Sequence, residues 1–199
     1  MAHHGKVYDA DMPLVLALET TGMCGSVALV GDGFCVGELS LLTKVTHSRR
    51  LLNAIETLFE QAGCDWDGVS GIAVSLGPGS FTGIRIALST AKGLAMAAGK
   101  PLVGISTLDG IAGQFTHLDK PLCVILDARK KEVYAAFYEC LADGTVKQTS
   151  DYMVLPPEQL AAQITEPTVM AGDGAEFYAD LFLNLLGDKA LLVNTACHF

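Results

Sequence analysis

The chain has 199 residues, half of them hydrophobic, and its 22 acidic and 13 basic side chains give a net charge of −9. This length and apolar content suit one large core or two small ones and argue against a disordered chain, while the negative charge argues against independent binding of a polyanion such as RNA. No apolar run reaches the roughly 18 residues of a membrane span, and the six scattered cysteines, with no Cys-x-x-Cys pair, indicate reduced thiols of a cytosolic protein.

The first part of the chain is predicted to hold a run of strands followed by alternating helices and strands. Residues 1–13 lack a hydrophobic signal core and are expected to be a leader or a loose tail. The helix at 48–62 is predicted from a broad apolar face and the glycine that follows it. The predicted strands are 14–18, 26–30, 34–41, 72–76 and 102–105, and the predicted helices are 48–62, 82–98 and 108–115.

A polar, proline-terminated stretch at 117–121 marks a break, after which a similar pattern starts again. The predicted strands there are 122–126, 132–138, 146–154, 168–171 and 191–193, with helices at 157–164 and 175–186. This order predicts an α/β protein with two sub-domains, the first at 14–116 and a smaller second one at 117–199.

A glycine-rich loop, Gly-Pro-Gly-Ser-Phe-Thr-Gly at 77–83, separates a buried strand from a helix. Ser80 or Thr82 can cap the helix, which leaves its other first N–H groups able to face an anion. The loop matches neither GxxxxGK[ST] nor GxGxxG. Its glycines can therefore serve a phosphate site or simply close packing of the backbone.

Two strings in the sequence carry a family resemblance. SLGPGSFTGIRIALSTAKGLA at 75–95 and LALETTGMCGSVALV at 16–30 closely resemble the TsaB (YeaZ) family. Its members are partners of TsaD, the enzyme that places threonylcarbamoyl on adenosine 37 of tRNAs. The resemblance implies an actin-like, Hsp70-like and sugar-kinase-like ATPase fold with a reduced second sub-domain. Family members carry further helical residues beyond the position of Phe199, so the C-terminus of this chain is either native or truncated.

In that fold, ATP lies in a cleft and is held by two hairpin turns and a later glycine turn. The residues that match these positions, together with the glycine-rich loop, are Thr20, Thr21, Gly77, Gly79, Ser80, Thr82, Gly83, Arg129, Gly172 and Gly174. The second turn has Ala128 and Arg129 where a phosphate-binding turn normally has a glycine. The chain alone is therefore expected to bind no cofactor tightly, and ATP or ADP is expected at a site shared with the partner.

The metal motif of TsaD-like enzymes is incomplete in this chain. Those enzymes carry HxxxH at the matching position, whereas this chain has His47 followed by Leu51. One imidazole makes a poor divalent site. The sequence also contains no G-x-S-x-G or HExxH motif, and no Cys–His spacing in it stands out as a catalytic pair. We expect no metal ligands and no catalytic residues.

A ridge of small side chains runs along the predicted helix 82–98. Ala87, Ala91 and Ala95 recur every four residues, and such ridges let a second helix approach closely. With Leu51, Leu52 and Ile55 of the helix 48–62, they are predicted to bind TsaD, or a second copy of this chain when TsaD is absent. The alternative is that both helices pack on their own sheet.

The resemblance implies a non-catalytic, cytoplasmic scaffold that activates TsaD on tRNAs reading ANN codons. TsaE and TsaC would complete the pathway, and tRNA would be met through the complex only. A stand-alone ATP-dependent enzyme of the sugar-kinase kind is the alternative interpretation, and a glycoprotease-like peptidase is the least favoured one.

Overall fold

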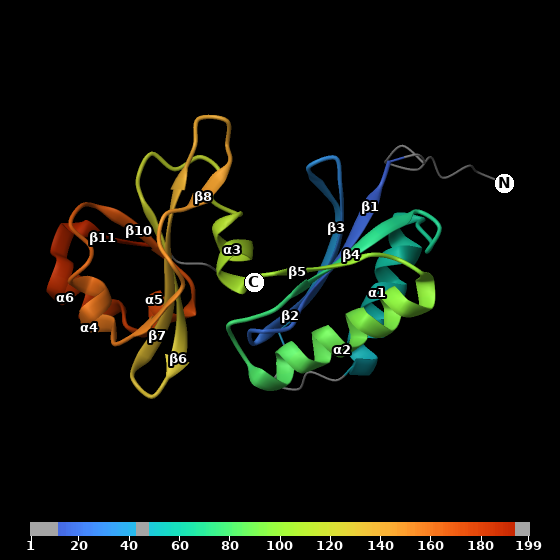
Figure 1. Cartoon of the computed structure of the whole chain (residues 1–199), viewed down its shortest axis with the longest axis horizontal. Coiled ribbons are helices and arrows are strands. Elements are labelled where there is room, and N and C mark those ends of the chain that lie inside the picture. The colour runs from blue at the N-terminus through green and yellow to red at the C-terminus, as the bar shows by residue number, and fades with distance from the viewer. Residues whose placement is uncertain (1–11, 43–47, 194–199) are drawn as a thin grey trace. The chain divides into compact units, whose positions relative to one another are not determined.

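The computed structural model describes residues 12–42 and 48–193, which form two compact units (Figure 1). Unit 1 takes the chain up to Leu76 together with Ser80–Ile105, and unit 2 takes Gly77–Gly79 and the chain from Ser106 onward. The predicted boundary at residue 117 is wrong, because the helix that follows Ile105 packs on the sheet of unit 2. No helix among the described residues is long and apolar enough to cross a bilayer.

Unit 1 is a five-stranded sheet, here called sheet A, with two helices on one face. The strand order is β3-β2-β1-β4-β5; β1, β2 and β3 are antiparallel neighbours, whereas β4 and β5 run parallel to β1. The elements are β1 (Leu14–Glu19), β2 (Cys24–Gly31), β3 (Phe34–Leu42), α1 (Ser48–Ala62), β4 (Val69–Ser75), α2 (Phe81–Ala98) and β5 (Leu102–Ile105).

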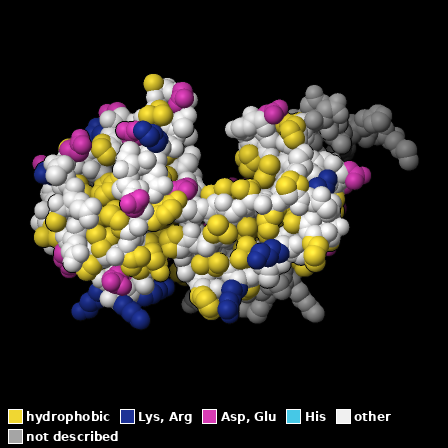
Figure 2. Space-filling model, viewed as in Figure 1, with side chains coloured by type: hydrophobic (Ala, Val, Ile, Leu, Met, Phe, Trp, Pro, Cys, Tyr) yellow, Lys and Arg dark blue, Asp and Glu magenta, His cyan; other side chains and the backbone are white. Residues whose placement is uncertain are grey.

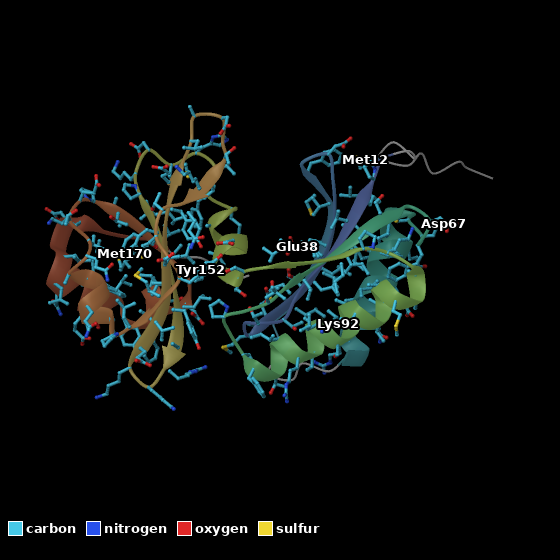
Figure 3. The ribbon with its side chains drawn as sticks, viewed as in Figure 1. Met12, Glu38, Asp67, Lys92, Tyr152 and Met170 are labelled. Atoms are coloured by element: carbon cyan, nitrogen blue, oxygen red, sulfur yellow. The ribbon has the colours of Figure 1, made fainter. Side chains whose placement is uncertain are left out.

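The core of unit 1 lies between sheet A and the two helices. Alternate residues of β1, Leu14, Leu16 and Leu18, are buried because successive side chains of a strand point to opposite faces. Met12 is buried beside them, and its side chain occupies the space that a Cβ on Gly31 would need. The expected loose leader therefore ends before Met12, which packs in the core (Figure 3).

Unit 2 is a six-stranded sheet, here called sheet B, with helices on both faces. Its main order is β11-β10-β6-β7-β8, and β9 also pairs with β7. α3 covers one face, and α4, α5 and α6 cover the other, where Met170 is buried (Figure 3). The elements are α3 (Thr107–Ala112), β6 (Leu122–Arg129), β7 (Glu132–Cys140), β8 (Val146–Gln148), β9 (Met153–Leu155), α4 (Pro157–Ala161), β10 (Thr168–Ala171), α5 (Asp173–Phe177), α6 (Ala179–Leu186), η1 (Gly187–Lys189) and β11 (Ala190–Leu192).

The two units repeat one topology. In each, three antiparallel strands lead into a strand–helix–strand pattern that adds two parallel strands beside the first strand. The expected architectural repeat is confirmed. Unit 2 is reduced in its helices: α3, α4, α5 and α6 have 6, 5, 5 and 8 residues, whereas α1 and α2 of unit 1 have 15 and 18.

Two predicted elements of unit 2 are each divided in the structure. The predicted strand 146–154 is β8 and β9, because the Ser150 hydroxyl accepts the N–H of Phe137 and interrupts the backbone ladder. The predicted helix 175–186 is α5 and α6, because Tyr178 leaves the helical region with φ −104° and ψ 22°. Both interruptions depend on tertiary contacts or backbone angles that the sequence pattern does not display.

Candidate functional site

The turn after β1 is attached to the first turn of α2 by hydrogen bonds. Thr20, only 3% exposed, donates its hydroxyl to the carbonyl oxygen of Gly83 at 2.7 Å. The N–H of Ser80 donates to the carbonyl oxygen of Thr21 at 2.6 Å, and the N–H of Thr21 donates to the Glu19 carboxylate. The Thr20 hydroxyl, expected to face a phosphate, is thus used within unit 1.

Gly83 permits this attachment because it has no side chain. A Cβ at residue 83 would lie 1.8 Å from the carbonyl oxygen of Thr20, far inside any allowed contact. Ser80 is the N-cap of α2, and its hydroxyl accepts the N–H of Gly83 at 3.2 Å, whereas Thr82 lies within the helix and is exposed. Of the two interpretations of the glycine-rich loop, close packing accounts for Gly83.

The Thr20 hydroxyl gives a direct test of this attachment. Thr20→Val keeps the shape of the side chain but removes the donor, and we expect the free energy of unfolding of unit 1 to fall by about 1 kcal/mol. Urea denaturation followed by circular dichroism measures the change. Thr20→Ser, which keeps the hydroxyl, is the matched control, and equal losses in both variants would contradict the role of the hydrogen bond.

The first part of the glycine-rich loop belongs to unit 2. Gly77 and Gly79 have φ of 100° and 153°, values at which residues with a side chain are strained. The carbonyl oxygen of Gly77 accepts the N–H of Thr107 at 2.9 Å, so the loop is joined to the start of α3. This backbone role leaves their predicted contact with a nucleotide untested.

The hairpin turn between β6 and β7 carries Arg129, the predicted phosphate ligand in unit 2. Its guanidinium lies 3.2 Å from the Asp127 carboxylate, and its N–H donates to the same carboxylate at 2.9 Å. The N–H of Asp127 donates to the Asp173 carboxylate at 3.0 Å, which joins the base of the hairpin to α5. Arg129 itself is largely exposed, so it remains open to an anion.

Gly172 and Gly174, the third predicted nucleotide turn, occupy the start of α5. Gly172 has φ 105°, and a Cβ there would lie 2.3 Å from the carbonyl oxygen of Ile125. A Cβ at Gly174 would lie 2.7 Å from the carbonyl carbon of Leu126. These positions repeat the packing of Gly83. In unit 1, α2 follows β4 and begins against the end of β1; in unit 2, α5 follows β10 and begins against the end of β6. Gly172–Gly174 is therefore the start of a helix, and its predicted contact with a nucleotide remains a prediction.

A small hollow opens between α3 and sheet B in unit 2. It has a volume of about 350 Å³, and its polar lining residues are Asp109, Thr116, Tyr138 and Gln148. The Asp109 carboxylate accepts hydrogen bonds from the hydroxyls of Tyr138 at 2.8 Å and of Tyr152 at 2.6 Å. Tyr152 is labelled in Figure 3. Burial, with the nearby Asp109 carboxylate, raises the pKa of Tyr138, which keeps its hydroxyl a donor at neutral pH.

Ser106 and Asp109 have the sequence spacing of a cap at the start of α3. Ser106 is at the N-cap position, but its side chain makes no capping hydrogen bond, and Asp109 instead binds the two tyrosines. The sequence pattern of a capping box is present without its geometry. The tyrosine contacts come from strands and loops far along the chain, and no local motif signals them.

The predicted partner-binding ridge is buried inside unit 1. Ala87 and Ala91 are 0% exposed and pack against sheet A in the core, together with Ala95, Leu51 and Ile55. The prediction that these five residues contact a partner is therefore wrong, since they have almost no surface to offer. Of the two interpretations left open, packing on their own sheet is the one that holds. Leu52, 39% exposed, remains a prediction.

The outward side of α2 does present an apolar surface. Phe81 is 69% exposed and Met96 is 85% exposed, and both lie on the helix side that also carries Arg85 and Lys92. The guanidinium of Arg85 lies 4.2 Å from the centre of the Phe81 ring. Lys92 is labelled in Figure 3. We call Phe81, Arg85, Lys92 and Met96 of α2, taken together with the exposed Leu52 of α1, the outer surface.

The described residues do not form a metal centre. Within 12–42 and 48–193, no group of three or more His, Cys, Asp or Glu side chains is placed to hold an ion. His47 lies outside the residues that the structure describes.

Two units that each repeat this strand order, with helices starting against the ends of the first strands, define an α/β protein of the actin-like ATPase fold. The family profile "TsaD: tRNA N6-adenosine threonylcarbamoyltransferase" matches residues 41–185. The TsaB protein of Escherichia coli is 32% identical over 172 residues, which cover 84% of this chain and 74% of that protein. The chain therefore belongs to the family that this profile describes, and within it to the TsaB (YeaZ) family.

Further similarities agree with this assignment. The TsaB protein of Bacillus subtilis is 27% identical over 187 residues, covering 92% of this chain and 81% of that protein. The structure of YeaZ from Pseudomonas aeruginosa superposes with a TM-score of 0.75 at 32% identity, covering 85% of this chain and 79% of that one. EutJ from Carboxydothermus hydrogenoformans, at 11% identity and a TM-score of 0.54, shares the fold alone.

Proposed function

We propose that this chain is the TsaB-type subunit of the system that makes tRNA threonylcarbamoyladenosine. It binds a TsaD-family transferase and supports the transfer of threonylcarbamoyl to N6 of adenosine 37 in tRNAs that read ANN codons. The observation that carries this proposal is the match to TsaB proteins over both units. The match to the TsaD profile adds that chain and partner share one ancestry, which suits a paired assembly of similar folds.

The outer surface of α1 and α2 is the part of unit 1 that fits such a partner. Phe81 and Met96 are large apolar side chains in solvent, and residues of this kind anchor protein interfaces when they fill a pocket of the partner. Arg85 and Lys92 lie beside them and supply a basic margin in an otherwise acidic chain. In the absence of the transferase, we propose that the same surface forms a homodimer.

In this proposal the transferase catalyses the reaction, and this chain is a non-catalytic cytoplasmic subunit. The internal hydrogen bond of the Thr20 hydroxyl and the bulky Arg129 at the second turn both favour weak nucleotide binding by the chain alone. ATP or ADP is then held at a site shared with the transferase. TsaC and TsaE act in the same pathway, and tRNA is met through the complex.

The proposal is tested by co-purifying the chain with the TsaD-family protein of its own organism, with and without ATP. We expect a stable complex, and nucleoside mass spectrometry should show threonylcarbamoyladenosine only when both proteins are present. Titration calorimetry of the chain alone with ATP and Mg²⁺ checks the alternative: micromolar affinity with turnover would identify a stand-alone kinase-like enzyme and contradict the proposal.

Two substitutions on the outer surface are expected to weaken assembly strongly without unfolding the chain. Phe81→Asp with Met96→Glu places two charges where apolar anchors are proposed, and we expect affinity for the transferase to fall at least about 100-fold. Phe177→Asp, at an exposed apolar residue of unit 2, is the matched control. Calorimetry measures both affinities, and circular dichroism verifies folding. Equal affinity for the wild type and the double variant would exclude this surface.

A further inference from the structure

The tip of the β6–β7 hairpin is the most basic point of an acidic protein. Arg129, Lys130 and Lys131 are consecutive, and all three are exposed. They make up three of the chain's 13 basic residues, against a net charge of −9. In Figure 2, dark-blue side chains project from the end of unit 2 where Figure 1 draws this turn.

The backbone of this turn is one that lysine does not favour. Arg129 pairs with Glu132 across the hairpin, so Lys130 and Lys131 form a two-residue loop, with φ of 53° and 65°. Arg129 is also left-handed, with φ 65°. A side chain on such a residue crowds the following carbonyl oxygen, and turns of this type normally use Asn-Gly or Asp-Gly.

A second hairpin in the same protein provides an internal comparison. The β2–β3 turn is also a two-residue loop of left-handed residues, and it consists of Asp32 and Gly33, with φ of 47° and 80°. The chain thus uses a favourable pair of residues at one tight hairpin and two lysines at the other. Folding alone does not account for that choice, and side chains kept at a strained position commonly serve binding.

The charges at this tip are also incompletely neutralised. Arg129 is paired with Asp127, but its exposed guanidinium retains donors for a second acceptor. Among the ion pairs between described residues, none involves Lys130 or Lys131. The base of the hairpin is held by the bond from Asp127 to Asp173, so the cations are presented on a supported backbone.

We propose that Arg129, Lys130 and Lys131 contact the phosphate backbone of RNA when this chain is in its complex. The inference rests on the proposed function, which supplies the RNA. Lys and Arg at a protruding tip contact phosphates without reading sequence. A protein partner is a poorer fit, because interface centres need large apolar anchors, and no large exposed hydrophobic residue lies within 127–134.

The test uses the complex with the transferase and a tRNA transcript, with binding followed by fluorescence anisotropy over a series of salt concentrations. Lys130→Asn with Lys131→Gly removes both charges and installs the favoured turn. We expect the melting temperature to rise by about 2 to 4 °C while tRNA affinity falls about tenfold at low salt. The slope of log affinity against log salt should shrink by about 2.

Two further variants separate charge from turn geometry and from overall charge. Lys130→Gln with Lys131→Gln keeps long side chains and should lose the same affinity without the gain in stability. Lys147→Gln with Lys189→Gln removes the same charge elsewhere on unit 2 and should bind tRNA as the wild type does. Unchanged affinity and slope in both tip variants would overturn the inference while leaving the proposed function intact.

The remaining outcomes also decide between the two proposals. If the wild-type complex binds no tRNA, the proposed function and this inference fail together. Titration with ATP in place of tRNA tests whether the phosphate groups that these cations contact belong to a nucleotide or to RNA. A loss of ATP affinity in the tip variants, with tRNA affinity unchanged, would assign the cations to a nucleotide and contradict the RNA contact.

Discussion

Replacing Gly83 with alanine is expected to lower the free energy of unfolding of unit 1 by at least about 3 kcal/mol. The added Cβ would lie 1.8 Å from the carbonyl oxygen of Thr20, so the start of α2 must move away from the end of β1. That movement breaks the hydrogen bonds from Thr20 to Gly83 and from Ser80 to Thr21. The loss therefore includes backbone strain and buried polar groups left without partners.

The same helix offers a control for this substitution. Gly93 lies in the interior of α2, and a Cβ there would meet nothing within 4 Å. Gly93→Ala should raise stability by about 0.5 to 1 kcal/mol, because alanine favours the helix. Chemical denaturation of both variants measures the contrast. A Gly83→Ala protein as stable as the wild type would show that the backbone contact is not needed.

The second large effect concerns Ala91, where tryptophan is expected to unfold unit 1 rather than to block a partner. Ala91 is fully buried between α2 and sheet A, in a core that has no room for an indole. We expect that Ala91→Trp either loses cooperative unfolding or lowers the free energy of unfolding by more than about 3 kcal/mol. Overpacking of this size cannot be relieved by rotamer changes.

Met96→Trp is the matched variant, because it places the same side chain on the exposed side of α2. It should fold as the wild type does and affect assembly alone. Far-ultraviolet circular dichroism during thermal melting distinguishes the two outcomes. If Ala91→Trp folds normally but fails to bind the transferase, the buried alanine ridge would be an interface after all.

Much of the fold could be predicted because the relevant signals are local. The helix 48–62 and the strand 168–171 have the predicted bounds, since a broad apolar helix face and a short apolar run between turns are strong patterns. The division of the helix at Tyr178 could not be predicted, because the residues on both sides favour a helix. The boundary at Ser106 was also hidden, since it depends on which sheet α3 packs against.

Less of the candidate site than of the fold could be predicted from the sequence. The sequence singles out Thr20, Gly83 and Gly172, but it does not distinguish a glycine that approaches a phosphate from one that approaches a carbonyl oxygen. The orientation of α2 was misjudged for a related reason. Apolar and small residues occur on both of its sides, so hydrophobicity alone does not indicate which side faces the sheet. Only the position of α2 on sheet A assigns Ala91 to the interior and Met96 to solvent.

The repeated topology has a consequence for how this protein can diverge. Each hydrophobic cluster is built from the residues of one repeat. A cavity or an enlarged side chain in one interior therefore needs no compensating change in the other. Core variants in unit 1 and core variants in unit 2 should accordingly change the free energy of unfolding additively when they are combined.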